Sequence, residues 1–346
     1  MIPTHIMSIR VAVNGLGRTG RQFFRACLND KEFGKSFDVV AFNDLVDPAS
    51  LAYFFKYDSV HGTLEKRVAH GEGYIEVDGR RYAVLNVNSP DKLPWSSLGV
   101  DVVVESTGLF TSRQLSEGHL KAGAKRVLIS APAKQPDVTL VPGVNMDRFD
   151  PKNHTIISAA SCTTNCLAPM LKVLLERYGV KRGFMSTVHA YTNDQRVLDL
   201  MHKSLRRSRA ASVSIIPTTT GAATAIGDVL PELKGKMDGT AFRVPVPDGS
   251  IIDLTAELAR ETTAEEINES YMESARGALN GILKYTEDPI VSADIIGNPS
   301  SCIIDGGGTS VLAEKGNFVK ILGWYDNEWG YANRLVDIIK YIARNL

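Results

Sequence analysis

The sequence predicts an α/β fold in two parts: a doubly wound parallel sheet, followed by an α+β part with a mixed or antiparallel sheet. Apolar strands alternate with helical segments in the first part, and strands with period-two character follow residue 165. The chain has 346 residues, whereas domains usually run to about 100–200. We therefore expect one domain of residues 1–160, with a C-terminal helix at 327–346 packing back on it, and a second of residues 161–326.

The first part begins with an apolar strand at residues 9–13, followed by glycines and then by helical apolar spacing at residues 21–28. This order is a strand, a turn and a helix. Further strands are predicted at residues 39–42, 102–105 and 127–130, with a helix at 113–122. Such alternation is typical of a parallel sheet covered by helices.

The second part changes its pattern. A long helix is predicted at residues 168–178, and strands of period two follow at 242–246 and 251–255. Apolar residues at helical spacing then predict a closing helix at 333–346.

Composition and charge exclude several classes of function. Lys plus Arg (39) balance Asp plus Glu (39), so no global positive field draws the chain to nucleic acid or anionic membranes. Any anion recognition must be local. No apolar run approaches the roughly 20 residues that span a bilayer, and residues 1–10 lack the apolar core of a secretory signal. We expect a cytoplasmic protein.

The four cysteines are too few and too scattered for a disulfide scaffold, which suits a reducing compartment. Cys162 and Cys166 are four residues apart and could be half of a metal site. No second Cys/His pair at zinc spacing completes it, and structural zinc requires four ligands. We expect no metal.

A glycine-rich motif follows the first strand. Gly15, Gly17 and Gly20 have the Gly-x-Gly-x-x-Gly spacing, which permits a tight turn and lets a helix N-terminus hold a pyrophosphate. Asp44 follows the second strand, where a carboxylate can bond both ribose hydroxyls of NAD and repel the extra phosphate of NADP. The alternative is a turn that binds nothing, with Asp44 as a plain cap. The order of strand, glycines, helix, strand and acid favours a Rossmann-type NAD site.

Cys162 and His189 are the candidate catalytic pair. Cys162 lies between a predicted strand and a helix, and the macrodipole at a helix N-terminus favours a thiolate. A catalytic thiol also needs a neighbouring imidazole, and His189, after a β-branched strand, is the best candidate. The alternative is a small buried cysteine and a structural histidine, which is how we interpret Cys166.

The residues around Cys162 resemble an active-site signature. The run Ser161-Cys-Thr-Thr-Asn-Cys166 is similar to that of the glyceraldehyde-3-phosphate dehydrogenase family. The likeness covers nearly the whole chain, through residues 56–62, 105–108, 130–134, 218–223, 230–235 and 324–328.

The resemblance implies oxidative phosphorylation of D-glyceraldehyde 3-phosphate to 1,3-bisphosphoglycerate with NAD+, through a thioester on Cys162, in glycolysis or gluconeogenesis. His189 would act as the base. The nearest alternative is erythrose-4-phosphate dehydrogenase, which usually hydrolyses its thioester; residues 218–221 and 191–192 favour the triose enzyme. From another class, the chain could be a surface or nucleic-acid binder with an idle site.

The resemblance also implies the remaining site residues. Thr192 and Arg243 would bind the substrate phosphate, and the attacking phosphate would contact Ser161, Thr163, Arg207, Thr220 and Gly221, because hydroxyls, N–H groups and guanidinium forks suit phosphate oxygens. Cofactor contacts would come from Arg18, Thr19, Ser130, Asn327 and Tyr331. The basic loop at residues 203–209, otherwise a solvated or nucleic-acid-binding patch, would border a neighbouring subunit's cofactor and so suggests a homotetramer.

The sequence departs from the family pattern in several places. Ala159 stands where asparagine is usual, Met201 where proline is common and Asn88 where an arginine is frequent. NAD preference therefore depends mostly on Asp44. The glycines at residues 306–308 replace a more alanine-rich stretch without a clear reason. Met7 resembles an ordinary start, which leaves Met1–Ile6 as an extension expected to be disordered.

Overall fold

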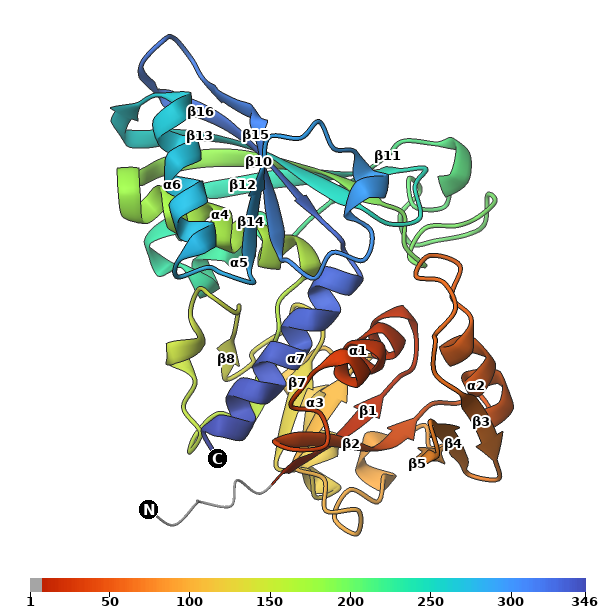
Figure 1. Cartoon of the computed structure of the whole chain (residues 1–346). Helices are drawn as coiled ribbons and strands as arrows, with labels where there is room; N and C mark the ends of the chain where they lie inside the picture. Colours follow the sequence, from red (N-terminus) through yellow and green to blue (C-terminus); the bar gives the residue numbers. More distant parts are fainter. Residues whose placement is uncertain (1–7) are drawn as a thin grey trace. The chain divides into compact units, whose positions relative to one another are not determined.

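The computed structural model describes residues 8–346, so the extension Met1–Ile6 lies outside the described residues. The chain forms two compact units, drawn in Figure 1. The first contains the described residues up to Leu140, together with Met146–Ala160 and Ala332–Leu346. The second contains Val141–Asn145 and Ser161–Tyr331. Within residues 8–346, no helix combines the length and the apolar character needed to cross a membrane.

The first unit is built on a nine-stranded sheet of order β3-β4-β5-β2-β1-β6-β7-β9-β8. From β5 to β8 every neighbouring pair is parallel, while β3 and β4 add an antiparallel edge. Because β2 and β6 lie on opposite sides of β1, the strand order reverses there, which is where doubly wound sheets bind ligands. The strands are β1 (Ile9–Asn14), β2 (Phe37–Asn43), β3 (Val68–Gly71), β4 (Tyr74–Val77), β5 (Arg80–Leu85), β6 (Val102–Glu105), β7 (Arg126–Ile129), β8 (Val138–Thr139) and β9 (Ile156–Ser158).

Local sequence signals begin the helices of this unit. Asp47 caps one helix through the Ser50 N–H, and Pro48 occupies its first turn, where a missing N–H costs nothing. Ser112 caps another through the Leu115 N–H. The helices are α1 (Arg18–Asn29), α2 (Pro48–Lys56), α3 (Arg113–Lys121) and, from Ala332 onward, α7 (Trp329–Arg344).

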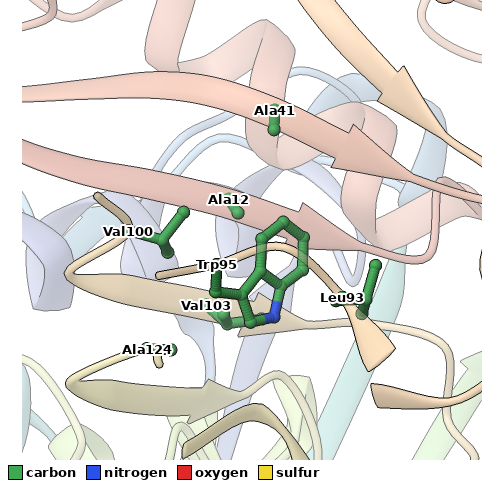
Figure 2. Close-up of a cluster of buried hydrophobic side chains, with 7 residues drawn as sticks. All are labelled: Ala12, Ala41, Leu93, Trp95, Val100, Val103 and Ala124. Atoms are coloured by element: carbon green, nitrogen blue, oxygen red, sulfur yellow. The ribbon is translucent and has the colours of Figure 1, made fainter. Parts of the chain in front are cut away.

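Strands β1, β2 and β6 share a buried core around Trp95, which is fully buried. Figure 2 shows its indole among small and branched side chains, with Ala12 from β1 and Val103 from β6 beside it. A second cluster joins Phe24 of α1 to Phe42 and Tyr82 by edge-to-face contacts. This packing holds the carboxyl ends of β1, β2 and β6 in fixed positions.

The second unit contains a seven-stranded mixed sheet of order β11-β12-β10-β13-β16-β15-β14. The β10–β12 and β14–β15 pairs are parallel and the others antiparallel. Helices α4 (Cys162–Tyr178), α5 (Ala222–Val229) and α6 (Ala264–Arg276) pack on it. The strands are β10 (Val180–Ala190), β11 (Ile216–Thr219), β12 (Met237–Val244), β13 (Ser250–Thr262), β14 (Leu283–Thr286), β15 (Cys302–Val311) and β16 (Gly316–Tyr325).

The predicted fold class is confirmed: a parallel doubly wound sheet and a second, mixed sheet are both present. Several details differ, among them the following. Strands β3–β5 occupy residues 68–85, where the sequence analysis predicted none. Helix α4 begins at Cys162 rather than at residue 168, and β13 extends to Thr262, beyond the predicted end at 255. Strands β3–β5 pair with their neighbours in sequence, but β3 and β4 have only 4 residues each and so show little of the apolar period that predicts a strand.

Candidate active site

Cys162 is the first residue of α4. Ser161 is the N-cap: its Oγ accepts the Thr164 N–H at 3.0 Å. Ala160, just before the cap, has a left-handed backbone (φ 55°), a conformation that costs a non-glycine residue about 1–2 kcal/mol. This strained turn sets the thiol at the start of a helix whose first N–H groups have no intrahelical partners.

His189 lies near the end of β10 and is buried, with 3% exposure. Its Nε2 is 3.5 Å from the Sγ of Cys162, within reach of a proton transfer between nitrogen and sulfur. The ring of Tyr325 packs edge-on against the imidazole, and the Tyr325 hydroxyl bonds the hydroxyls of Thr163 (3.0 Å) and Thr187 (2.8 Å). The structure therefore brings the two predicted catalytic residues together.

Arg243 is the register partner of His189 across the parallel β10–β12 pair. Its Nη1 lies 2.7 Å from the His189 Nδ1 and donates to the Ala190 carbonyl at 3.1 Å. The same Nδ1 is 2.7 Å from that carbonyl. An arginine N–H only donates and a carbonyl oxygen only accepts. The Nδ1 atom can therefore either accept from Arg243 or donate to Ala190, but it cannot do both at once. A proton on Nδ1, donated to Ala190, is the arrangement that leaves the Nε2 lone pair facing Cys162.

Burial determines the protonation of the pair. Burial, and next the positive charge of Arg243, lower the pKa of His189 from 6.5 to about 3, although the Ala190 carbonyl opposes them. Burial raises the pKa of the Cys162 thiol, while Arg243 and hydrogen bonds from Thr163 act in the opposite direction. The imidazole is thus neutral at neutral pH. Burial opposes the helix-stabilised thiolate that the sequence predicts, whereas Arg243 and Thr163 favour it.

The predicted phosphate-binding residues lie in the same unit, in different settings. The positive charge of Arg243 lowers the pKa of Arg207, after burial, so these two guanidinium groups are near each other. Arg207 also pairs with Asp194 and donates to the Thr219 carbonyl. Arg243, and Arg207 with its charge partly offset by Asp194, bring positive charge to this region of a chain of zero net charge.

The other predicted phosphate-binding residues offer hydroxyl and N–H donors. Thr220 and Gly221 directly precede α5, and Gly221 is its N-cap. Thr192 is exposed. The hydroxyls of Ser161 and Thr163 are already engaged, the first as the α4 cap and the second with Tyr325.

Asn327 is held by a hydrogen-bonded chain. Its Oδ1 accepts from the Ser250 hydroxyl at 2.6 Å, and the Ser250 Oγ accepts the Ala190 N–H at 3.1 Å. The amide orientation is therefore fixed, with Nδ2 as the group that donates. Tyr331 is buried in the first turn of α7, where burial raises the pKa of its phenol.

The glycine motif occupies the turn between β1 and α1 in the first unit. Gly15 has a φ of 90°, and a Cβ there would lie 2.6 Å from the Thr107 nitrogen. A Cβ on Gly20 would lie 2.1 Å from the Gly15 oxygen. Gly17, the N-cap of α1, has open space where its Cβ would be. These are the three positions that a dinucleotide turn requires: a tight turn, access for the pyrophosphate and close helix packing.

A pocket of about 260 Å³ opens beside this turn, lined by the ends of β1, β2 and β6. Asp44 lies on its wall and accepts the Leu16 N–H at 2.6 Å, and Asn88 lines it too. Ser130, at the end of β7, donates to the Glu105 carbonyl. The Arg18 side chain is paired with buried Asp58 at 2.6 Å. Thr19 lies in the first turn of α1, so backbone N–H groups there are available to a pyrophosphate.

Sequence reasoning missed two groups near these sites. Tyr325 was quoted only within a matched segment, yet its hydroxyl and ring fix Thr163 and His189. Glu105, at the end of an all-valine strand, and His119 form a buried pair at 3.0 Å. A charged residue directly after three valines was the available signal, because buried carboxylates need donors.

A reversing parallel sheet with a dinucleotide turn, together with a Cys–His pair at the start of a helix, defines an NAD-dependent dehydrogenase. Family models match residues 9–113 as the NAD binding domain, and residues 161–327 as the C-terminal domain, of glyceraldehyde 3-phosphate dehydrogenase. The chain belongs to the glyceraldehyde-3-phosphate dehydrogenase family.

Curated relatives match along almost the whole chain. A glyceraldehyde-3-phosphate dehydrogenase of Streptomyces coelicolor is 57% identical over 341 residues, covering 98% of this chain and 100% of the relative. Those of Geobacillus stearothermophilus and Bacillus subtilis are each 54% identical, covering 97% and 98% of this chain and 99% of each relative.

Proposed function

We propose that the enzyme oxidises D-glyceraldehyde 3-phosphate to 1,3-bisphosphoglycerate with NAD+ and inorganic phosphate, in glycolysis or gluconeogenesis. The observation that carries the proposal is the 3.5 Å approach of the Cys162 Sγ to the His189 Nε2 beside Arg243, in a chain of this family. The curated relatives carry the same activity in their names.

Cys162 is the nucleophile. Its sulfur attacks the aldehyde carbon, and the thiol proton reaches the aldehyde oxygen through the His189 Nε2, giving a thiohemiacetal. The Cys162 backbone N–H, in the first turn of α4, is placed to stabilise the developing oxyanion.

His189 is the base of the oxidation. Bound NAD+ supplies the hydride acceptor. The His189 Nε2 takes the thiohemiacetal hydroxyl proton as the carbon loses hydride, which leaves a thioester on Cys162 and an imidazolium. Phosphate then attacks the thioester carbon, the C–S bond breaks, and the imidazolium returns its proton to the departing sulfur.

Two anion sites serve this chemistry. Arg243, with Thr192, binds the substrate phosphate; the proximity of Arg243 to both His189 and Arg207 supports this assignment. The attacking phosphate is bound by the residues at the starts of α4 and α5 and by a guanidinium: Ser161, Thr163, Thr220, Gly221 and Arg207. Phosphate is a bidentate acceptor that suits such donors.

NAD is bound by the residues that the sequence predicts for it. The fingerprint residues Gly15, Gly17, Arg18, Thr19 and Gly20 hold the pyrophosphate, and Asp44 bonds the ribose hydroxyls, with Ser130 at the same sheet edge. Asn327, oriented by Ser250, donates from Nδ2 to the nicotinamide carboxamide near Tyr331. We assign NAD binding to residues 1–160 with the helix at 327–346, and catalysis to 161–326; the division into two compact units supports this.

We also propose a homotetramer in the cytoplasm. Large apolar side chains are exposed in the basic loop and just before it, with Leu200, Met201 and Leu205 each at least 64% exposed, which favours burial against another subunit. The four cysteines form no disulfide, in keeping with a reducing compartment.

The test is the rate of NAD+ reduction with glyceraldehyde 3-phosphate, with and without inorganic phosphate, beside erythrose 4-phosphate. We expect fast turnover of the triose only when phosphate is present. Phosphate-independent turnover favouring the tetrose would overturn the proposal.

A further inference from the structure

A buried polar network lies under the dinucleotide pocket, within the first unit. Its centre is Glu105, the last residue of β6, which is 1% exposed. One carboxylate oxygen accepts the Thr107 N–H at 2.8 Å and the Thr107 hydroxyl. The other accepts the Asn14 amide at 2.6 Å and faces the His119 Nε2 at 3.0 Å. A buried carboxylate with these partners acts only as an acceptor.

Trp95 fixes the proton of His119. The indole N–H, which can only donate, points at the His119 Nδ1 at 3.0 Å. The Nδ1 atom must therefore accept, so His119 is neutral and carries its proton on Nε2, where it donates to Glu105. The donor direction runs from Trp95 through His119 to Glu105, and all three side chains are buried.

The network ends at groups that line the pocket. Asn14 and Thr107 both do so. The Oδ1 of Asn14 accepts from Asn43, a third lining residue, at 2.7 Å. Thr107 is also the residue whose backbone nitrogen lies against Gly15. Glu105 therefore ties the turn after β6 to the glycine turn after β1, and these two turns pack against each other and line the pocket.

We propose that Glu105 and His119 are positioning residues for the dinucleotide: they hold the Thr107 and Gly15 turns packed together in the arrangement that NAD requires. This inference rests on the NAD site described above. Neither side chain touches the reacting atoms, so their loss weakens cofactor binding and leaves the chemical step intact.

Because hydrogen bonds are donated from Trp95 to His119 and from His119 to Glu105, substitutions of Glu105 and His119 test the proposal directly. In Glu105→Gln, one acceptor becomes an amide that faces either the Thr107 N–H or the His119 N–H. His119 cannot relieve the clash by moving its proton, because Nδ1 would then oppose the Trp95 N–H. His119→Leu removes both contacts, whereas His119→Gln keeps an acceptor for Trp95 and a donor for Glu105.

The experiment titrates NAD+ into the full-length protein without substrate, and measures kcat at saturating NAD+ and thermal stability alongside. We expect the Kd of Glu105→Gln and His119→Leu to rise about tenfold, equivalent to 1.4 kcal/mol, with kcat near that of wild type, and His119→Gln to bind almost as wild type. Val127→Ala, a fully buried core change in β7 of the same unit, is the control for lost stability.

Wild-type affinity in His119→Leu, or an equal loss of affinity in Val127→Ala and in His119→Gln, would overturn the inference. If Glu105→Gln does not fold, the two His119 variants decide alone. A wild-type protein that binds NAD+ but does not oxidise the triose would contradict the proposed function and leave this inference standing.

Discussion

At the scale of single residues, burial changes the acidity of both Cys162 and His189. Burial raises the pKa of Cys162 and lowers that of His189. A neutral imidazole 3.5 Å from a thiol is ready to receive its proton. When the sulfur adds to the carbonyl, His189 can act as the base because it is already deprotonated at neutral pH.

We expect Cys162→Ser to abolish dehydrogenase turnover, because a hydroxyl is a far weaker nucleophile than sulfur at neutral pH. His189→Asn should lower kcat by about 10²–10⁴, the usual contribution of general base catalysis. The measurement is steady-state kcat with saturating triose, phosphate and NAD+. Unaltered rates in either variant would contradict the assignment, while unchanged NAD+ binding in both would exclude misfolding.

Asp44→Gly should relax the discrimination against NADP. The Asp44 carboxylate lies on the pocket wall, and a like charge beside a phosphate costs several kcal/mol. We expect the ratio of kcat/KM for NAD+ over NADP+ to fall by at least about tenfold. Asp47→Gly removes a nearby carboxylate that only caps α2, so it should leave the ratio unchanged; an unaltered ratio in Asp44→Gly would show that other residues set the preference.

Residues with a local signature were predictable, and residues defined by packing were not. The glycine turn and Asp44 follow from spacing alone, since strand, turn and helix are consecutive in sequence. The partners of His189 could not be predicted in this way. Arg243 was predicted only from the family resemblance, and its pairing with His189 depends on the β10–β12 register. The Trp95–His119–Glu105 network joins residues from three separate segments, which no local period reveals.

At the scale of elements, the start of α4 contains both the helix cap, Ser161, and the nucleophile, Cys162. Sequence periodicity placed this helix at residue 168, because residues 162–167 are mostly polar or small. The Ser161 cap extends it back to Cys162, so the helix begins at the nucleophile.

Two substitutions of Ser161 distinguish its contribution to helix capping from its contribution to phosphate binding. Ser161→Ala should destabilise the protein by about 0.5–2 kcal/mol, whereas Ser161→Gly should cost only a few tenths. Both remove the hydroxyl proposed for the attacking phosphate, so both should raise the KM for phosphate alike. Thermal melting measures the loss of stability, and phosphate titration measures the KM for phosphate. A KM that rises in Ser161→Ala but not in Ser161→Gly would contradict the phosphate role, because both variants lack the hydroxyl.

At the scale of the whole molecule, two buried groups limit stability from opposite sides of the pH range. His189 has a folded pKa of about 3, below its unfolded value of 6.5, so the unfolded chain binds more protons between these values and stability falls as pH falls through them. Asp248 has the opposite shift: burial and the charge of Asp326 raise its pKa from 3.8 to about 9. The folded state then holds the extra proton, and stability falls as pH rises from about 4 to 9.

Replacing Asp248 by Asn should remove the second effect. Asn is nearly isosteric with the protonated carboxyl, and its oxygen can still accept the Gly249 N–H that the Asp248 Oδ1 accepts at 2.8 Å. We expect the melting temperature to match wild type near pH 4 and to exceed it by a few degrees at pH 8, since 1 kcal/mol shifts the melting temperature of a domain of about 150–250 residues by about 2–4 °C.

Asp238→Asn is the matched control for that prediction. Its Oδ1 likewise accepts the N–H of the following residue, Gly239, at 2.7 Å, but Asp238 is exposed. Its melting curve should therefore follow wild type from pH 4 to 9. A rise in the melting temperature of Asp248→Asn that is equally large at pH 4 and pH 8 would contradict the prediction, because only a titrating group makes the rise grow with pH. The same rise in Asp238→Asn would also show that the buried proton on Asp248 is not its source.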